Sequence, residues 1–322
     1  MMMDNIEWYD IFIETLYKKY QRKTELIQAL MDLLFIEREA VYRRLRREVL
    51  FSVYEMAKIS KAWNISLDAI MGTNSGNIPF QLQQMNCINP SKDELEQFRH
   101  ILQILQSIKD YPDTEFMEIC NKLPYQITAG YEYLNRFCLF KCIYQYGNDT
   151  EVVPFSKTVI SSEKAQYTTE YDKVIKQVPS SSFIFDRRLF EILVSNIRYF
   201  YSIRLITAEE KDLIKKDLFN LLDYLLDAAN NGCYPETKKK VSLYISEINI
   251  GTNYSYTFSK EVQICYVHVF EKYKIYTIEK EMVTNFRRWM QLKKRSSIKI
   301  SVVNERCRIE YFAKQRQIVD TL

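Results

Sequence analysis

The 322-residue chain is poor in glycine, proline and histidine, with 6, 7 and 2 of them. This scarcity excludes collagen-like and low-complexity chains, and 47% hydrophobic with 27% charged residues is typical of a folded protein. The seven cysteines form no C-x-x-C pair, which argues against a structural zinc site and favours a reduced environment. We therefore predict no metal and no other cofactor.

Long apolar runs are also missing. No segment approaches the roughly 18 residues that a membrane span needs, and acids lie near the N-terminus, where a signal peptide carries positive charge. The sequence contains no glycine-rich phosphate loop, H-E-x-x-H or G-x-S-x-G motif. We therefore predict a cytoplasmic protein that has no membrane partner and is not an enzyme.

The pattern of apolar residues changes along the chain. Helical spacing dominates up to about residue 234, and alternating apolar residues follow. We predict a mainly α fold with an N-terminal five-helix domain, a helical middle domain and a C-terminal mixed α+β domain. Their predicted bounds are 1–74, 91–234 and 235–322, with a linker over 75–90.

Helix and strand signals are spread over both later domains. In the middle domain we predict helices over about 114–122, 125–145, 162–177 and 185–204, and after the capping boxes Ser91/Glu94 and Thr207/Glu210. In the C-terminal domain we predict strands over 241–245, 262–270, 273–277 and 298–302, and helices over 286–292 and 309–319. His268 falls within a predicted strand, and we interpret it as a structural residue.

The N-terminal domain shows five short amphipathic segments. We predict helices over 6–20, from an N-cap at Thr24 to residue 34, over 37–48, from the Ser52/Glu55 capping box onward, and over 67–71. In the third of these helices Val41 and Leu45 are spaced to face inward.

The third helix carries an unusual density of arginine. Arg43, Arg44, Arg46 and Arg47 fall within five residues, and Arg38 lies about one turn earlier. Arginine can address guanine edges through two hydrogen bonds and can also clamp phosphates. A merely solvated charged helix is the alternative interpretation of this cluster.

The residues around this helix resemble the XRE/Cro-type bacterial helix-turn-helix regulators over about residues 5–72. A capped helix is followed by Ser66-Leu67-Asp68-Ala69-Ile70-Met71-Gly72, and this family typically has Ser-Leu-Asp-x-Ile/Leu-x-Gly there. Without gaps, the family's Leu-Leu-Gly-Val-Ser-x-x-x-Val stretch falls on residues 33–41. The resemblance implies that residues 37–47 form a recognition helix in the major groove of DNA.

The resemblance also implies roles for single residues. The predicted base-reading residues are Arg38, Glu39, Tyr42 and Arg43, the predicted phosphate contacts are Arg46 and Arg47, and Arg44 is included among the DNA-binding residues. The chain departs from the family at three places: Phe35 replaces the turn glycine, and Leu26 and Ile27 replace the Thr-Gln pair that touches the DNA backbone.

These features predict a sequence-specific transcriptional regulator that binds double-stranded DNA as a homodimer. The C-terminal domain would supply assembly or the sensing of a small-molecule or protein effector. Two alternatives stay open. One is a protein-interaction adapter whose helix-turn-helix does not bind DNA. The other is an enzyme whose site is assembled from the C-terminal tyrosines, Tyr244, Tyr254, Tyr256, Tyr266, Tyr273 and Tyr276.

Overall fold

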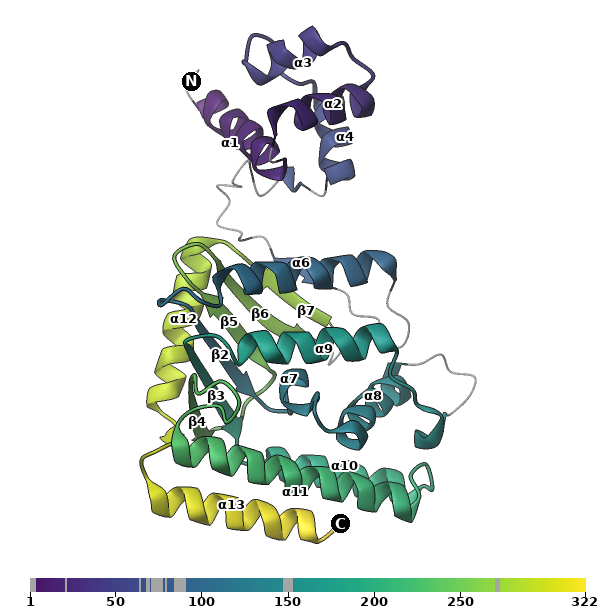
Figure 1. The fold of residues 1–322 in the computed structure, drawn as a ribbon, viewed down its shortest axis with the longest axis vertical. Coiled ribbons are helices and arrows are strands. Elements are labelled where there is room, and N and C mark those ends of the chain that lie inside the picture. Colours follow the sequence, from purple (N-terminus) through teal and green to yellow (C-terminus); the bar gives the residue numbers. More distant parts are fainter. Residues whose placement is uncertain are drawn as a thin grey trace. The chain divides into compact units, whose positions relative to one another are not determined.

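The computed structural model divides into two compact units, Met1–Pro79 and Phe80–Leu322 (Figure 1). It describes residues 4–20, 22–63, 65–67, 70, 78, 80–83, 91–146, 153–269 and 273–322, without the side chains of 4–7 and 93. Within these ranges, no helix combines the length and the apolar character needed to cross a membrane.

The first unit is a small helical bundle. Its helices are α1 (Asp4–Lys19), α2 (Lys23–Leu34), α3 (Arg38–Leu45) and α4 (Val53–Trp63). Each helix contributes a fully buried side chain to one shared core: Phe12, Leu30, Val41 and Ile59. The fifth helix predicted over 67–71 lies largely outside the described residues, although Ile70 belongs to the same core.

Local signals placed some ends of these helices correctly and others not. The Ser52/Glu55 capping box is confirmed, because each backbone N–H donates to the other residue's side chain, at 2.7 and 3.2 Å. The predicted N-cap at Thr24 is wrong, since α2 is capped by Arg22. The third helix ends at Leu45 and does not reach residue 48, because Arg47 adopts a left-handed backbone with φ of 67°.

The second unit is built on one sheet of eight strands in the order β1-β7-β6-β5-β2-β3-β4-β8. The strands are β1 (Gln81–Gln83), β2 (Glu115–Cys120), β3 (Ser180–Asp186), β4 (Lys240–Ser246), β5 (Tyr254–Phe258), β6 (Gln263–Val269), β7 (Tyr273–Thr277) and β8 (Ile298–Lys299). Strands β2, β3 and β4 are parallel, and all other neighbouring pairs are antiparallel.

Helices cover both faces of this sheet unequally (Figure 1). They are α6 (Lys92–Ile108), α7 (Tyr125–Thr128), α8 (Glu132–Tyr146), α9 (Ser162–Ile175), α10 (Leu189–Ser202), α11 (Ala208–Asn231), α12 (Lys280–Arg295) and α13 (Glu305–Asp320). Helix α12 packs on one face, where Phe286 and Met290 meet Met117 and Ile184. The main core fills the opposite face, beneath most of the other helices.

The predicted boundary near residue 235 is wrong. Strands β2 and β3 of the supposed helical middle domain pair with β4 and β5, so residues 80–322 form one α+β unit. The predicted helix over 114–122 is strand β2, and the predicted helix over 185–204 begins inside β3. Both strands are covered on both faces, and such strands lack the alternation that distinguishes a strand from a helix in sequence.

Predictions for the remaining elements were more accurate. The strands predicted over 241–245, 262–270 and 273–277 correspond to β4, β6 and β7. The strand predicted over 298–302 is only the two residues of β8, and β5 was not predicted. Residues 81–83 of the predicted linker form strand β1, which pairs with β7.

Gly232 supplies a direct test of the packing in this unit. It ends α11 with φ of 67°, and a Cβ atom there would lie 2.5 Å from Cγ2 of Val302. We predict that Gly232→Ala lowers the free energy of unfolding by about 1 to 3 kcal/mol, through backbone strain and steric overlap. Urea unfolding followed by circular dichroism measures this change.

Gly130→Ala is the matched control, because a Cβ atom at Gly130 meets nothing within 4 Å. Its unfolding midpoint should stay near that of the unmodified chain. Equal midpoints for the two variants would contradict this account of Gly232.

Candidate nucleic-acid interface

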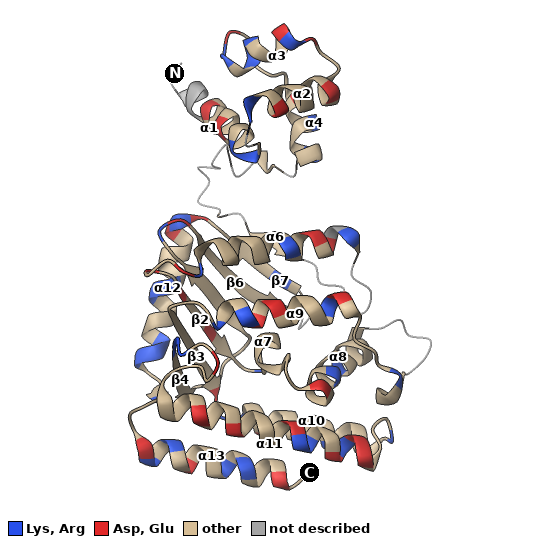
Figure 2. Cartoon of the chain, in the orientation of Figure 1, with Lys and Arg blue, Asp and Glu red and all other residues tan. Residues whose placement is uncertain are grey.

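Helix α3 presents opposite faces to the core and to solvent. Val41 and Leu45 are buried against α1, α2 and α4. At about 100° per residue, Arg43 between them points away from that core, whereas Tyr42 packs against its edge and Arg44 is half-buried. Of the seven predicted DNA-binding residues, Tyr42 and Arg44 are half-buried. The other five are exposed: Arg38, Glu39, Arg43, Arg46 and Arg47. Figure 2 shows the basic and acidic residues that accompany α3.

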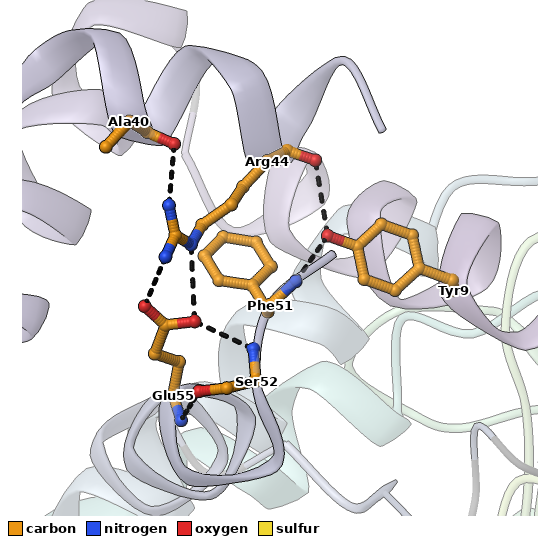
Figure 3. Close-up of polar contacts among 6 residues, drawn as sticks. All are labelled: Tyr9, Ala40, Arg44, Phe51, Ser52 and Glu55. Carbon is orange, nitrogen blue, oxygen red and sulfur yellow. Dashed lines mark hydrogen bonds and ion pairs between the residues drawn. The ribbon is translucent and has the colours of Figure 1, made fainter. Parts of the chain in front are cut away.

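Arg44 differs from its neighbours because its side chain is held inside the unit (Figure 3). Its Nε and one terminal nitrogen donate to the two carboxylate oxygens of Glu55, at 3.2 and 2.8 Å. The other terminal nitrogen donates to the Ala40 carbonyl at 3.1 Å, and the side chain is only 18% exposed. These donors fix α3 on α4, which argues against the prediction that Arg44 contacts DNA.

Tyr9 completes this attachment from helix α1. Its hydroxyl donates to the Arg44 carbonyl at 3.2 Å and accepts from the backbone N–H of Phe51 at 3.0 Å. Both contacts are buried or partly buried, and burial raises the pKa of Tyr9, so the hydroxyl keeps its proton. Residues of α1, of α3 and of the loop before α4 thus meet at the end of α3 (Figure 3).

The exposed arginines have weaker partners. Arg43 lies 3.6 Å from Glu48, and Arg46 lies 3.4 Å from Glu48 and 3.7 Å from Glu39. These side chains are about half exposed, and exposed ion pairs contribute roughly 0 to 1 kcal/mol. Their guanidinium groups can therefore exchange a carboxylate for another anion at small cost.

Arg47 is placed differently again. It follows the end of α3 in a left-handed backbone, and its Nε donates to Asp10 of α1. Its side chain is about half exposed. The structure thus leaves this guanidinium at the surface, but with a carboxylate partner from another helix.

Cations gather around the ring of Tyr42. The guanidinium carbons of Arg38 and Arg46 lie 5.9 and 5.5 Å from the ring centroid, and Nζ of Lys23 lies 5.9 Å from it. Cations within about 6 Å of an aromatic face are attracted to it. The ring therefore helps to hold three cations from α2 and α3 together on one surface.

Lys23 was not among the predicted site residues. The resemblance directed attention to Leu26 and Ile27, which are fully buried in the core. Helix α2 begins three residues earlier, at Lys23, and its first turn is exposed. A basic residue just before the apolar run of α2 was the signal that could have identified it.

The first unit also carries an exposed aromatic patch. Phe35, in the turn between α2 and α3, is 85% exposed and adopts a left-handed backbone with φ of 56°. Tyr54 at the start of α4 is also exposed. Nζ of Lys58 lies 5.5 Å from the ring of Phe35 and 5.0 Å from the ring of Tyr54. We call Phe35, Tyr54 and Lys58 the aromatic patch.

The tyrosines of the C-terminal strands do not gather in one place. Tyr244, Tyr254 and Tyr256 pack on the side of the sheet that α12 covers. Tyr266 and Tyr276 pair with each other, with ring centroids 5.7 Å apart. Strand alternation puts Tyr266 on the opposite face from its neighbour Cys265, which belongs to the α12 side.

Comparison with known proteins identifies no relative: no family model, curated protein or solved structure matches the chain. Among the residues that the structure describes, no three His, Cys, Asp or Glu side chains are grouped to hold a metal ion. The chemistry of the surface around α3 is therefore the main guide to the function of the first unit.

The attachment of α3 predicts unequal effects for two neighbouring arginines. We expect Arg44→Ala to destabilise the first unit by about 2 kcal/mol, because it leaves the partly buried Glu55 without its charged partner. Arg46→Ala should change stability by less than about 0.5 kcal/mol, since its ion pairs are exposed. Hydrogen exchange of the α3 and α4 amides in the full chain measures both, and similar exchange rates in the two variants would argue against the assigned roles.

Glu55 also predicts a dependence on pH. Partial burial favours its protonated form, but hydrogen bonds from Arg44 and Ser52 outweigh that effect and hold the pKa of the carboxyl below its ordinary value. The ionised form therefore stabilises the folded unit above the ordinary pKa of about 4.3, and this stability is lost as the pH falls through the lower folded-state pKa.

We expect Glu55→Gln to be less stable than the unmodified chain at pH 7 and to lose less further stability between about pH 5 and pH 3. Amide exchange of α3 and α4 as a function of pH measures this difference. Glu48→Gln is the control, because Glu48 is about half exposed and its ion pairs are long. Parallel pH profiles for the unmodified chain and Glu55→Gln would contradict the prediction.

Proposed function

We propose that residues 1–79 form a helix-turn-helix domain of the XRE/Cro type and that the protein is a sequence-specific, DNA-binding transcriptional regulator. The observation that carries this proposal is that the arginines of α3 have two different roles. Arg44 fixes the helix to the bundle, while Arg38, Arg43 and Arg46 remain exposed beside Tyr42. A helix anchored along one side and cationic on the other suits the major groove of DNA.

In this proposal α2 and the turn at Phe35 set α3 into the major groove. Arg38, Glu39, Tyr42 and Arg43 meet base edges, where arginine addresses guanine and Glu39 accepts from a cytosine amino group. Arg46 and Arg47 contact phosphates, and we add Lys23 to that group because it shares the Tyr42 surface. The carboxylates that now face Arg43 and Arg46 would give way to DNA phosphates or bases.

The proposed regulator acts as a homodimer. One module offers few phosphate contacts, and its arginines already have acidic neighbours, so its affinity for DNA is modest. Two copies bound to half-sites about 34 to 36 Å apart would combine their affinities. The second unit would supply assembly or effector sensing.

The aromatic patch favours a second candidate function, that of a protein-interaction adapter. Phe35 is 85% exposed and Tyr54 is 68% exposed, and exposed apolar patches often mark sites of protein–protein interaction. The family's DNA-backbone position is also occupied by the buried Leu26 and Ile27. In this alternative the first unit binds a protein through Phe35 and Tyr54 and does not bind DNA.

Selection of bound fragments from a random DNA pool by the full chain tests the proposal. We expect an enriched motif with two half-sites, and affinity that falls steeply as the salt concentration rises. Arg43→Ala should cost about 1 to 3 kcal/mol and relax specificity at one position, whereas Arg46→Ala should weaken binding to all sequences and reduce the salt slope by about 1.

Arg306→Ala is the matched control, because Arg306 is 90% exposed on α13 in the second unit. It should leave the affinity and the selected motif unchanged. If the unmodified chain enriches no fragment even at low salt, the DNA-binding proposal fails. Equal losses from Arg306→Ala and Arg46→Ala would show that the binding is not centred on α3.

A further inference from the structure

The second unit contains a pocket at the carboxyl end of β2 that is lined by residues of α8 and α10. Its volume is about 70 Å³. A single water needs roughly 10 to 15 Å³ by the same measure, so the pocket has room for about half a dozen water-sized groups. Ligands commonly bind outside the carboxyl ends of parallel strands, at a switch in topology. Strand β2 is an outer strand of the three parallel ones, because its neighbours β3 and β5 run parallel and antiparallel to it.

Asn253 fixes the wall of this pocket. Its Oδ1 accepts from the backbone N–H groups of Asn121 and Lys122, at 2.9 and 3.2 Å. Its Nδ2 donates to Glu118 at 3.2 Å and to the Lys122 carbonyl at 3.1 Å. This side chain is buried, and three of its four hydrogen bonds hold the loop after β2 against the start of β5. The pocket is therefore formed before any ligand arrives.

His268 on β6 contributes an unused polar group to the pocket. It is only 6% exposed, its backbone N–H donates to the Asn253 carbonyl, and its carbonyl accepts from the Thr252 hydroxyl. Neither of its ring nitrogens has a hydrogen-bond partner within the described part of the chain. Burial, together with Lys274 and Lys122, lowers the pKa of His268 well below its ordinary value, so the ring is neutral near pH 7.

The rest of the lining divides into a cationic side and an apolar side. Lys122 and Lys141 both line the pocket, and none of the described lining residues is acidic. The apolar side is formed by α8 and α10, with Phe137, Leu189 and Leu193 among its residues. A ligand that fits both sides carries a negative charge at one end and a short hydrocarbon chain at the other.

We propose that this pocket binds a small aliphatic monocarboxylate. The carboxylate accepts a hydrogen bond from the ring N–H of His268 and lies near the ammonium groups of Lys122 and Lys141. The alkyl chain packs against Leu189 and Leu193 of α10. This inference concerns the second unit alone and does not depend on DNA binding by the first.

The chain's two histidines allow a direct test. In full-length protein labelled with ¹³C at histidine Cε1, the NMR signal of His268 should shift and saturate as straight-chain carboxylates from acetate to hexanoate are added. The half-saturating concentration should fall about fourfold for each added methylene until the pocket is full. The signal of His100, which is exposed on α6, should not move. Hexylamine and hexanol should not produce the saturating shift.

Ile192→Glu tests the location of binding. Ile192 lines the pocket but is 46% exposed, so a charged side chain there should repel the carboxylate without disturbing the core. We expect hexanoate to bind about tenfold more weakly. The control Ile203→Glu changes a residue that is 40% exposed at the end of α10, away from the pocket, and it should bind like the unmodified chain.

Three results would overturn the proposal. The first is a His268 signal that stays unmoved by every carboxylate in the folded, unmodified chain. The second is an equal saturating shift with hexylamine or hexanol, which would exclude selection for the charge. The third is equal hexanoate affinity in folded Ile192→Glu and Ile203→Glu, which would place the ligand elsewhere.

Discussion

The two hydrogen bonds between Arg44 and Glu55 determine how helix α3 sits in the first unit. Glu55 also accepts from the backbone of Ser52, so the same carboxylate caps α4 and holds α3. Tyr9 adds a contact from α1 to the end of α3. Because these bonds are shielded from solvent, they fix the rotation of α3 about its axis far better than the exposed ion pairs could. Which arginines remain at the surface follows from that rotation.

Buried polar residues have a comparable role in the second unit. Asn253 joins the loop after β2 to the start of β5, where the sheet changes from parallel to antiparallel pairing. The buried Glu118 accepts a hydrogen bond from Asn253 and another from Gln126 of α7. In each unit a single carboxylate or amide connects different elements: Glu55 joins α3 to α4, and Asn253 joins the loop after β2 to the start of β5.

The sequence predicted the parts of the structure that depend on local signals. Capping residues such as Ser52 and Ser91 marked the starts of helices, and the spacing of Val41 and Leu45 identified the buried side of α3. Strands with a half-buried face, such as β6 and β7, were also identified. The coarse description, mainly helical with a C-terminal α+β region, agrees with the structure.

Other features depend on contacts that a single sequence does not display. Strands β2 and β3 are buried on both faces, so Phe183, Ile184 and Phe185 form a run without alternation. The different roles of Arg43 and Arg44 could not be predicted from the sequence for a similar reason. Nothing next to Arg44 in sequence distinguishes it from Arg43, and its partner Glu55 lies on another helix. The exposure of Lys23 depended on where α2 begins.

Phe35 has an evolutionary consequence. A left-handed backbone disfavours every residue with a Cβ atom, and glycine would occupy φ of 56° without strain. Substitutions at solvent-facing positions usually change stability by less than about 0.5 kcal/mol, so drift alone would tend to erase a phenylalanine there. Its persistence in a lineage would therefore be a sign of purifying selection by whatever molecule touches the ring, and not of any requirement of the fold itself.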